Sequence, residues 1–355
     1  MSHRTLLLWA LLLLPVLARA ERGFEARDLA KMDRFSSPTL SPDGRRVVFA
    51  KRVVDFDANK ASTSLWIEDL FARDAAPPVR FTPVGWNVNS PAFSPDGDTI
   101  YFLSAKNGSS QLYAMPASGG KPKQLTDFAL DIDGYKLSPD GKRVALAFGV
   151  YAGCKSDLAC TRKQLDDAGK RKTTGVVFDR MFIRHWDTWA DGRLNRVFVA
   201  PLGGKGMTKT ATLVGGDVVG DIPSKPFGDL SDLAWSPDGE TLVFSARKSD
   251  ATEPWSTNFD LYQVAAHGSG TGKNLTGDNP AWGAGPVFGA DGRTLYYRAM
   301  KRPGFEADRF ALMAMDLASG ATREIPPQWD RSPDGITLSE DGRRIYTTAQ
   351  DMGGH

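Results

Sequence analysis

The sequence contains few of the residues that carry covalent or metal chemistry. Its 355 residues include two cysteines and four histidines. It has no G-x-S-x-G nucleophile elbow, no P-loop, no dinucleotide-binding glycine motif and no H-E-x-x-H zinc motif. His3 lies at the start, His267 in a glycine-rich stretch and His355 at the last position, so His185 alone has a distinctive context. We therefore expect no catalytic residue, no metal site and no cofactor in this chain.

Excess charge and long apolar segments are also scarce. The formal net charge of +2 gives no electrostatic basis for binding nucleic acid. One extended apolar run, residues 5–17, follows a basic start and precedes Ala18-Arg19-Ala20. This layout is typical of a cleaved secretory signal peptide, and the run is shorter than the roughly 20 residues of a membrane span. We expect residues 1–20 to be removed on export, leaving no membrane span in a mature protein that begins near Glu21.

The two cysteines, Cys154 and Cys160, lie six positions apart in a polar stretch. The spacing excludes a C-x-x-C redox pair, and two cysteines without nearby histidines make a poor zinc site. In an oxidising compartment the pair predicts a disulfide that closes a small surface loop.

An internal repeat is the strongest feature of the sequence. The tetrapeptide Ser-Pro-Asp-Gly recurs at Ser41, Ser94, Ser138 and Ser236, and two weaker copies follow at Gly289 and Ser339. Successive copies are about 40–55 residues apart, the length of one propeller blade, except for a double interval between Asp140 and Asp238.

Each copy lies between two short apolar segments. In the second copy residues 91–93 precede the turn and residues 99–102 follow it, and two further strand-like segments come before the next copy. The Asp-Gly pair suits a hairpin turn, because glycine reaches positive φ without steric cost. Four strands per repeat predict an all-β fold, a β-propeller over residues 21–355 in which about six repeats are visible and the last is incomplete.

The double interval contains one visible set of blade strands. We interpret residues 151–193 as an insertion in the third blade that carries the two cysteines. A charged segment at residues 161–172 predicts a short solvated helix, because its basic residues are mixed with acidic ones.

Several longer stretches resemble a known family. Residues 175–189, which end in R-H-W-D-T-W, residues 255–260 and residues 302–309 resemble the N-terminal propeller of bacterial prolyl oligopeptidase-family serine peptidases, in the secreted dipeptidyl aminopeptidase and acylaminoacyl-peptidase-like branch. The resemblance covers the whole mature chain, although TolB-type propellers share the tetrapeptide. It implies a periplasmic protein whose propeller covers a C-terminal α/β-hydrolase domain and admits short peptides to it. The chain stops within the sixth repeat, so we expect a truncated chain that lacks the hydrolase domain and is inactive alone.

Two groups of residues are site candidates under this resemblance. Glu306, Asp308 and Arg309 could hold the amino terminus of a peptide, because a carboxylate pairs well with an α-amine in a dry cavity. The favoured interpretation is instead a structural ion-pair cluster between blades.

The second group is His185, Trp186, Asp187 and Trp189. It is either a loop at the domain interface or a motif that packs one blade on the next, and packing is the favoured interpretation. Two functions remain open: the non-catalytic propeller portion of a periplasmic serine exopeptidase, or a stand-alone TolB-type propeller that binds a partner protein.

Overall fold

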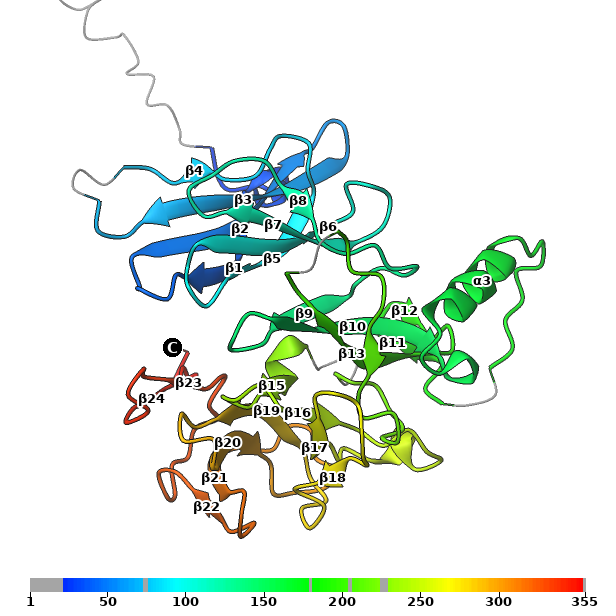
Figure 1. The fold of residues 1–355 in the computed structure, drawn as a ribbon, viewed down its shortest axis with the longest axis vertical. Coiled ribbons are helices and arrows are strands. Elements are labelled where there is room, and N and C mark those ends of the chain that lie inside the picture. Colours follow the sequence, from blue (N-terminus) through cyan, green and yellow to red (C-terminus); the bar gives the residue numbers. More distant parts are fainter. Residues whose placement is uncertain (1–21, 73–75, 179–180, 204–205, 224–228, 354–355) are drawn as a thin grey trace, which may run out of the picture.

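The computed structural model describes residues 22–72, 76–178, 181–203, 206–223 and 229–353 (Figure 1). The predicted signal peptide, residues 1–20, lies outside the described residues.

Most of the described chain forms small antiparallel sheets whose strands follow one another in chain order. The first sheet contains β1 (Arg34–Leu40), β2 (Arg46–Asp55), β3 (Lys60–Asp69) and β4 (Val79–Arg80). The second contains β5 (Val88–Phe93), β6 (Thr99–Ser104), β7 (Gln111–Pro116) and β8 (Lys123–Gln124). The third contains β9 (Gly134–Leu137), β10 (Arg143–Tyr151), β13 (Arg193–Pro201) and β14 (Thr212–Leu213).

The later repeats continue this pattern. The fourth sheet contains β15 (Leu233–Trp235), β16 (Thr241–Ala246), β17 (Asp260–Ala265) and β18 (Lys273–Asn274). The fifth contains β19 (Gly283–Phe288), β20 (Thr294–Ala299), β21 (Ala311–Asp316) and β22 (Thr322–Glu324). The sixth has two strands in the described chain, β23 (Thr337–Leu338) and β24 (Ile345–Tyr346). The sheets follow one another around an arc (Figure 1), and none of the described sheets closes on itself.

Helices are few. Helix α2 (Ala26–Lys31) precedes the first sheet, and the short 3-10 helices η2 (Leu230–Asp232) and η3 (Glu253–Trp255) lie in connections. The connection from β10 to β13 contains η1 (Ala152–Cys154), helix α3 (Leu158–Gly169) and a hairpin of β11 (Arg184–His185) and β12 (Thr188–Trp189). The predicted helix at residues 161–172 therefore exists but begins and ends three residues earlier. Asp157 caps its start by accepting a hydrogen bond from the Cys160 N–H at 3.0 Å.

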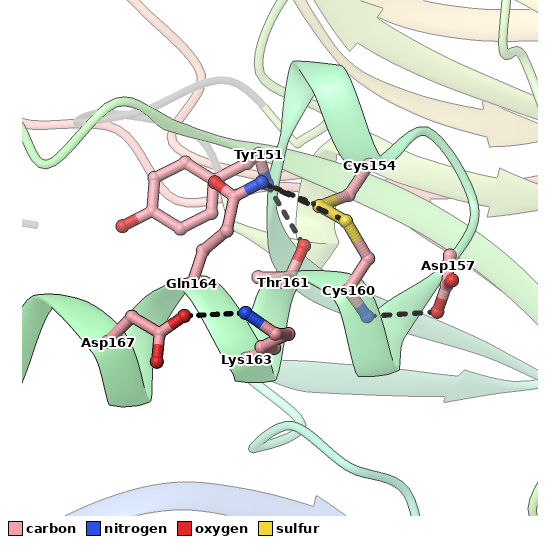
Figure 2. Close-up of a disulfide and its surroundings, with 8 residues drawn as sticks. All are labelled: Tyr151, Cys154, Asp157, Cys160, Thr161, Lys163, Gln164 and Asp167. Atoms are coloured by element: carbon pink, nitrogen blue, oxygen red, sulfur yellow. Dashed lines mark hydrogen bonds and ion pairs between the residues drawn. A yellow bond between two sulfur atoms is a disulfide. The ribbon is translucent and has the colours of Figure 1, made fainter.

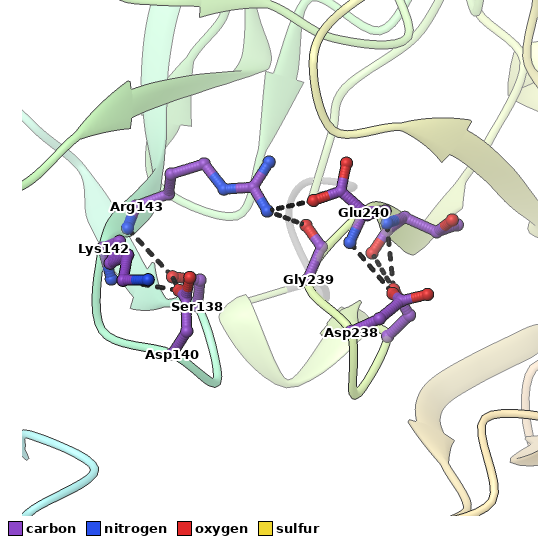
Figure 3. A network of polar contacts seen from close by, with 9 residues as sticks. Ser138, Asp140, Lys142, Arg143, Asp238, Gly239 and Glu240 are labelled. Atoms are coloured by element: carbon purple, nitrogen blue, oxygen red, sulfur yellow. Dashed lines mark hydrogen bonds and ion pairs between the residues drawn. The ribbon is translucent and has the colours of Figure 1, made fainter.

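The tetrapeptide forms one turn that recurs between the first and second strands. In the third sheet Ser138 Oγ donates to the Asp140 carboxylate at 2.6 Å and accepts from the Arg143 N–H at 2.9 Å (Figure 3). Asp140 also accepts from the Lys142 N–H at 3.0 Å, and Gly141 has φ +68°. The serine, aspartate and glycine thus satisfy the turn's polar groups and supply its left-handed residue.

Successive turns contact one another. The proline of one turn packs on the glycine of the next: an added Cβ would lie 3.3 Å from Pro42 at Gly97 and 3.2 Å from Pro95 at Gly141. An arginine two residues after the glycine of a turn also contacts the next turn along the chain. Arg143 donates to the Gly239 carbonyl at 2.6 Å and pairs with Glu240 at 2.8 Å (Figure 3). Arg46 likewise donates to the carbonyl of Gly97 at 3.1 Å. The turns therefore form a directional ladder from each repeat to the next.

Apolar layers fill the spaces between neighbouring sheets. The four interfaces from the first sheet to the fifth contain, in order, Val48 with Ile100, Leu103 with Leu146, Val197 with Phe244, and Val243 with Leu295. These side chains are buried because alternate residues of a strand point to opposite faces of its sheet, and both faces are covered.

The innermost strands contain a bulge that the sequence pattern did not reveal. The register shifts between Ser36 and Thr39 in β1, and at the equivalent places in β5 and β19. Each bulge contains a residue with positive φ that precedes proline: Ser37, Ser90 and Gly285. The extra residue bends the strand where the inner strands of neighbouring sheets converge.

Candidate functional site on the loop face

The connections between the second and third strands lie at the opposite end of the sheets from the tetrapeptide turns. We call this end the loop face. In the third sheet this connection begins with the disulfide between Cys154 and Cys160 (Figure 2). Next to it, the buried Thr161 hydroxyl accepts a hydrogen bond from the Tyr151 N–H at 3.2 Å, at the end of β10. The disulfide and Thr161 thus attach helix α3 to the sheet.

Removal of the disulfide is expected to have a modest effect. The double variant Cys154→Ser/Cys160→Ser should lose at most about 2 kcal/mol of unfolding free energy, because the bridge closes a loop of sequence separation six. Urea denaturation with and without reductant measures this loss, and mass spectrometry of the non-reduced protein checks the bridge. Two alkylatable thiols in the purified, non-reduced protein would contradict it.

The hairpin of β11 and β12 places its aromatic side chains near the surface. Trp189 stacks on Phe178 with ring centroids 6.0 Å apart, and the Arg184 guanidinium lies 5.3 Å from the Trp189 ring. Trp186 has φ 47° and is 73% exposed. The hairpin tip is thus presented outward, and the tryptophans are not buried between two sheets.

His185 links this hairpin to the fourth sheet. Its ring packs on Phe182 at 4.6 Å, and the Arg247 guanidinium lies 5.2 Å from the same Phe182 ring. A cavity of about 220 Å³ is lined by His185, Phe182, Ser249 and Glu253, among others. Partial burial and the nearby Arg247 cation lower the pKa of His185, while the Glu253 and Glu306 carboxylates act in the opposite direction. Residues from the insertion and from the segment after β16 therefore meet at His185.

Arg247, which follows β16, contacts the residues around His185. Its side chain is 6% exposed, pairs with Glu253 at 3.3 Å and lies 5.0 Å from the Phe259 ring. Ser249 Oγ also donates to Glu253 at 3.1 Å. The sequence reasoning missed Arg247 and Glu253, because neither belongs to a repeated motif and the contact depends on how β16 meets the insertion.

The structure separates the three residues that were candidates for binding a peptide amino terminus. Asp308 accepts hydrogen bonds from the backbone N–H groups of Lys301 at 2.9 Å and Arg302 at 2.8 Å, and from Arg302 Nε at 2.8 Å. Desolvation raises the pKa of Asp308, but these bonds outweigh it and bring the pKa to about 2. Asp308 therefore shapes its own loop.

Arg309 has a partner in another strand. Its guanidinium pairs with Glu324 in β22 at 2.7 Å, and Lys301 pairs with the same carboxylate at 3.1 Å. Asp308 and Arg309 thus pair with different residues of the fifth repeat, whereas the sequence interpretation placed them with Glu306 in one cluster between blades. Glu306 is exposed and acts electrostatically on His185.

Exposed apolar side chains surround this region. Gly304 N–H donates to Thr257 Oγ1 at 2.8 Å, which joins the loop of Glu306 to the loop that carries Trp255. Trp255 is 82% exposed, and Phe305 is also exposed. The loop face therefore combines exposed aromatic side chains with the exposed Glu306 carboxylate, a combination suited to contacts with a peptide or a protein.

In the part of the chain that the structure describes, no group of three or more histidine, cysteine, aspartate or glutamate side chains is placed to hold a metal ion. None of the helices in the described ranges is both long enough and apolar enough to cross a bilayer.

Comparison with known proteins gives consistent relatives. No family model matches the chain. It is 30% identical to dipeptidyl-peptidase 5 of Porphyromonas gingivalis over 319 residues, which are 90% of this chain and 45% of that protein. It is also 30% identical over 343 residues to dipeptidyl-peptidase 5 of Aspergillus fumigatus, covering 90% of this chain and 46% of the relative. The chain thus spans about half the length of the curated relatives that it matches.

Solved structures agree on the fold. The acylaminoacyl peptidase of Pyrococcus horikoshii matches with a TM-score of 0.65 at 14% identity, over 92% of this chain and 44% of that one. The β-propeller domain of the trilobed protease of Pyrococcus furiosus matches with a TM-score of 0.57 at 14% identity, over 91% of this chain and 81% of that one. The chain is therefore a relative of the dipeptidyl-peptidase 5 proteins, and its fold is similar to the β-propeller domain of the trilobed protease and to part of the acylaminoacyl peptidase, as the sequence resemblance predicts.

Proposed function

We propose that this chain is the non-catalytic propeller portion of a secreted serine exopeptidase of the dipeptidyl or acylaminoacyl type. In this role it limits access to a hydrolase domain so that short peptides enter and folded proteins do not. The proposal rests chiefly on the match to dipeptidyl-peptidase 5 proteins over 90% of this chain but 45% of the relative. The absence of a G-x-S-x-G motif from the sequence supports the non-catalytic role.

Glu306 is the residue that we retain as a contact for the peptide amino terminus. Asp308 and Arg309 are engaged in holding their own loop and β22. Glu306 instead is exposed on the loop face, next to the exposed Phe305 and in a loop that is hydrogen-bonded to the Trp255 loop, and its carboxylate acts electrostatically on His185. A carboxylate next to aromatic surface attracts an α-ammonium group and excludes part of its water.

We also propose a periplasmic location. The support is the signal-peptide layout of residues 1–20 and the pairing of Cys154 with Cys160, which suits an oxidising compartment.

The 355-residue protein is expected to show no serine-peptidase activity. It should not hydrolyse chromogenic dipeptide substrates, and a fluorophosphonate probe should label no serine, because neither the nucleophile motif nor a histidine partner is present. Active-site titration with mass spectrometry measures this, and a related full-length dipeptidyl peptidase serves as the positive control. Stoichiometric labelling of a single serine would overturn the non-catalytic role.

The reading frame tests the peptidase assignment directly. A frame that continues beyond codon 355 into a G-x-S-x-G segment supports it. A stop codon immediately after codon 355, together with capture of a specific partner protein, would show the stand-alone propeller that binds a protein.

A further inference from the structure

The connection between β10 and β13 contains a cavity that is separate from the group around His185. The cavity has a volume of about 940 Å³ and is lined by helix α3, by the segment that follows it and by the end of the β11–β12 hairpin. Its described lining residues all lie between Tyr151 and Asp191, and no other sheet contributes one. The cavity is therefore built within a single repeat, and its volume is that of a typical site for a small organic ligand.

Three aromatic side chains line the cavity. Phe178 and Trp189 stack on each other with ring centroids 6.0 Å apart, and Trp189 is still 59% exposed. Tyr151 is the third aromatic residue, and Figure 2 shows the Gln164 side chain beside it. Aromatic rings attract a further ring in offset-stacked or edge-to-face geometry. The lining therefore favours a ligand that contains an aromatic ring.

The wall that carries Tyr151 is held in place by contacts within the chain. Gln164 Nε2 donates a hydrogen bond to Cys154 Sγ at 3.2 Å, at the disulfide that attaches helix α3 to the sheet (Figure 2). The Tyr151 ring packs against Gly192, where an added Cβ would lie 3.6 Å from it. Helix α3 and the end of β10 are thus already positioned, so a ligand pays little ordering entropy when it binds.

The charged residues that line the cavity leave one cation without a partner. Asp167 pairs with Lys163 at 2.7 Å. Asp191 pairs with Arg193, also at 2.7 Å. Arg171 lines the cavity too, and none of the described residues forms an ion pair with its guanidinium. An unpaired guanidinium beside aromatic rings suits a carboxylate, which accepts two parallel hydrogen bonds from its N–H groups.

We propose that this cavity binds an aromatic carboxylate, whose ring packs on Phe178 and Trp189 and whose carboxylate accepts hydrogen bonds from Arg171. The carboxylate belongs either to the C-terminal aromatic residue of a peptide or to a free aromatic acid, because both present the same ring and the same charge. Glu306, the proposed contact for a peptide amino terminus, is not among the described lining residues. The inference therefore does not depend on the proposed peptidase function.

Isothermal titration calorimetry of the 355-residue protein tests the chemistry of the ligand. N-acetylphenylalanine should bind at a single site. Its amide, which lacks the charge, and N-acetylalanine, which lacks the ring, should each bind about tenfold more weakly or worse, because each loses one of the two contacts. Comparison of N-acetyl-Ala-Ala-Phe with phenylacetate distinguishes the sources: the tighter ligand shows whether the site takes peptide C-termini or free acids. The acetyl group removes the α-amine, so that Glu306 has no part in this binding.

Two pairs of variants identify the residues that hold the ligand. Arg171→Gln should weaken binding of N-acetylphenylalanine about tenfold, whereas Lys172→Gln removes the same charge at a position outside the described lining and should leave the affinity unchanged. Trp189→Ala should also weaken binding, and Trp186→Ala is its control, because Trp186 lies in the same hairpin but outside the described lining. Circular dichroism verifies that each variant folds. No saturable binding, equal affinity for N-acetylphenylalanine and its amide, or equal effects of Arg171→Gln and Lys172→Gln would overturn the proposal.

Discussion

Replacement of Arg247 by alanine is expected to lower the free energy of unfolding by about 3 kcal/mol, because it leaves the Glu253 carboxylate without its cation in a mostly buried position. The substitution also removes the cation that lies over the Phe182 and Phe259 rings. This cation joins the insertion, which carries Phe182, to the fourth sheet. Urea denaturation at neutral pH measures the loss.

Lys248 provides the matched control for Arg247. It is the next residue, carries the same charge and pairs with Asp250 at the surface at 3.2 Å. Lys248→Ala should therefore change stability by less than about 1 kcal/mol. If Arg247→Ala had an equally small effect, the buried cation would not be what holds the hairpin of β11 and β12 to the fourth sheet.

The turn ladder predicts a second large effect, at Gly141. Alanine at Gly141 should cost about 1–2 kcal/mol for its φ of +68° and roughly a further 1 kcal/mol because its Cβ would lie 3.2 Å from Pro95. Gly44→Ala isolates the backbone cost, since Gly44 has φ +69° and no neighbour within 4 Å of an added Cβ. The difference between the two variants in chemical denaturation measures the contact between turns.

Two outcomes are informative for this pair. A larger loss for Gly141→Ala than for Gly44→Ala is expected, and the difference would grow if Pro95 in the preceding turn cannot move. Equal losses would mean that Pro95 moves away without cost, and the ladder would then contribute little to the stability of the junction.

Local sequence signals predicted the fold well, because each repeat carries its own turn. The Ser-Pro-Asp-Gly copies mark where one strand ends and the next begins, and the residues around Asp140 form the hydrogen bonds that such a turn requires. The charged segment near Lys163 likewise predicted a helix, although its start at Leu158 depended on the Asp157 cap.

The candidate site could be predicted less completely, because it depends on contacts between distant segments. The sequence singled out His185, but Arg247, which contacts the Phe182 ring beside His185, follows β16 with no motif around it. The separate partners of Asp308 and Arg309 follow from the path of one loop, which a short motif does not specify. The bulge at Ser90 could not be predicted either, because a Ser-Pro pair alone does not fix the strand register.

The position of the long connection between β10 and β13 has a consequence for how such a protein can change. Tetrapeptide turns join first and second strands at one end of the sheets, whereas this connection leaves from the other end. Residues can therefore be added or exchanged between Tyr151 and Arg193 without altering any contact from Pro42 to Gly97 or from Pro95 to Gly141. One end of the molecule can thus stay constant as scaffold while the other end diverges to suit new ligands.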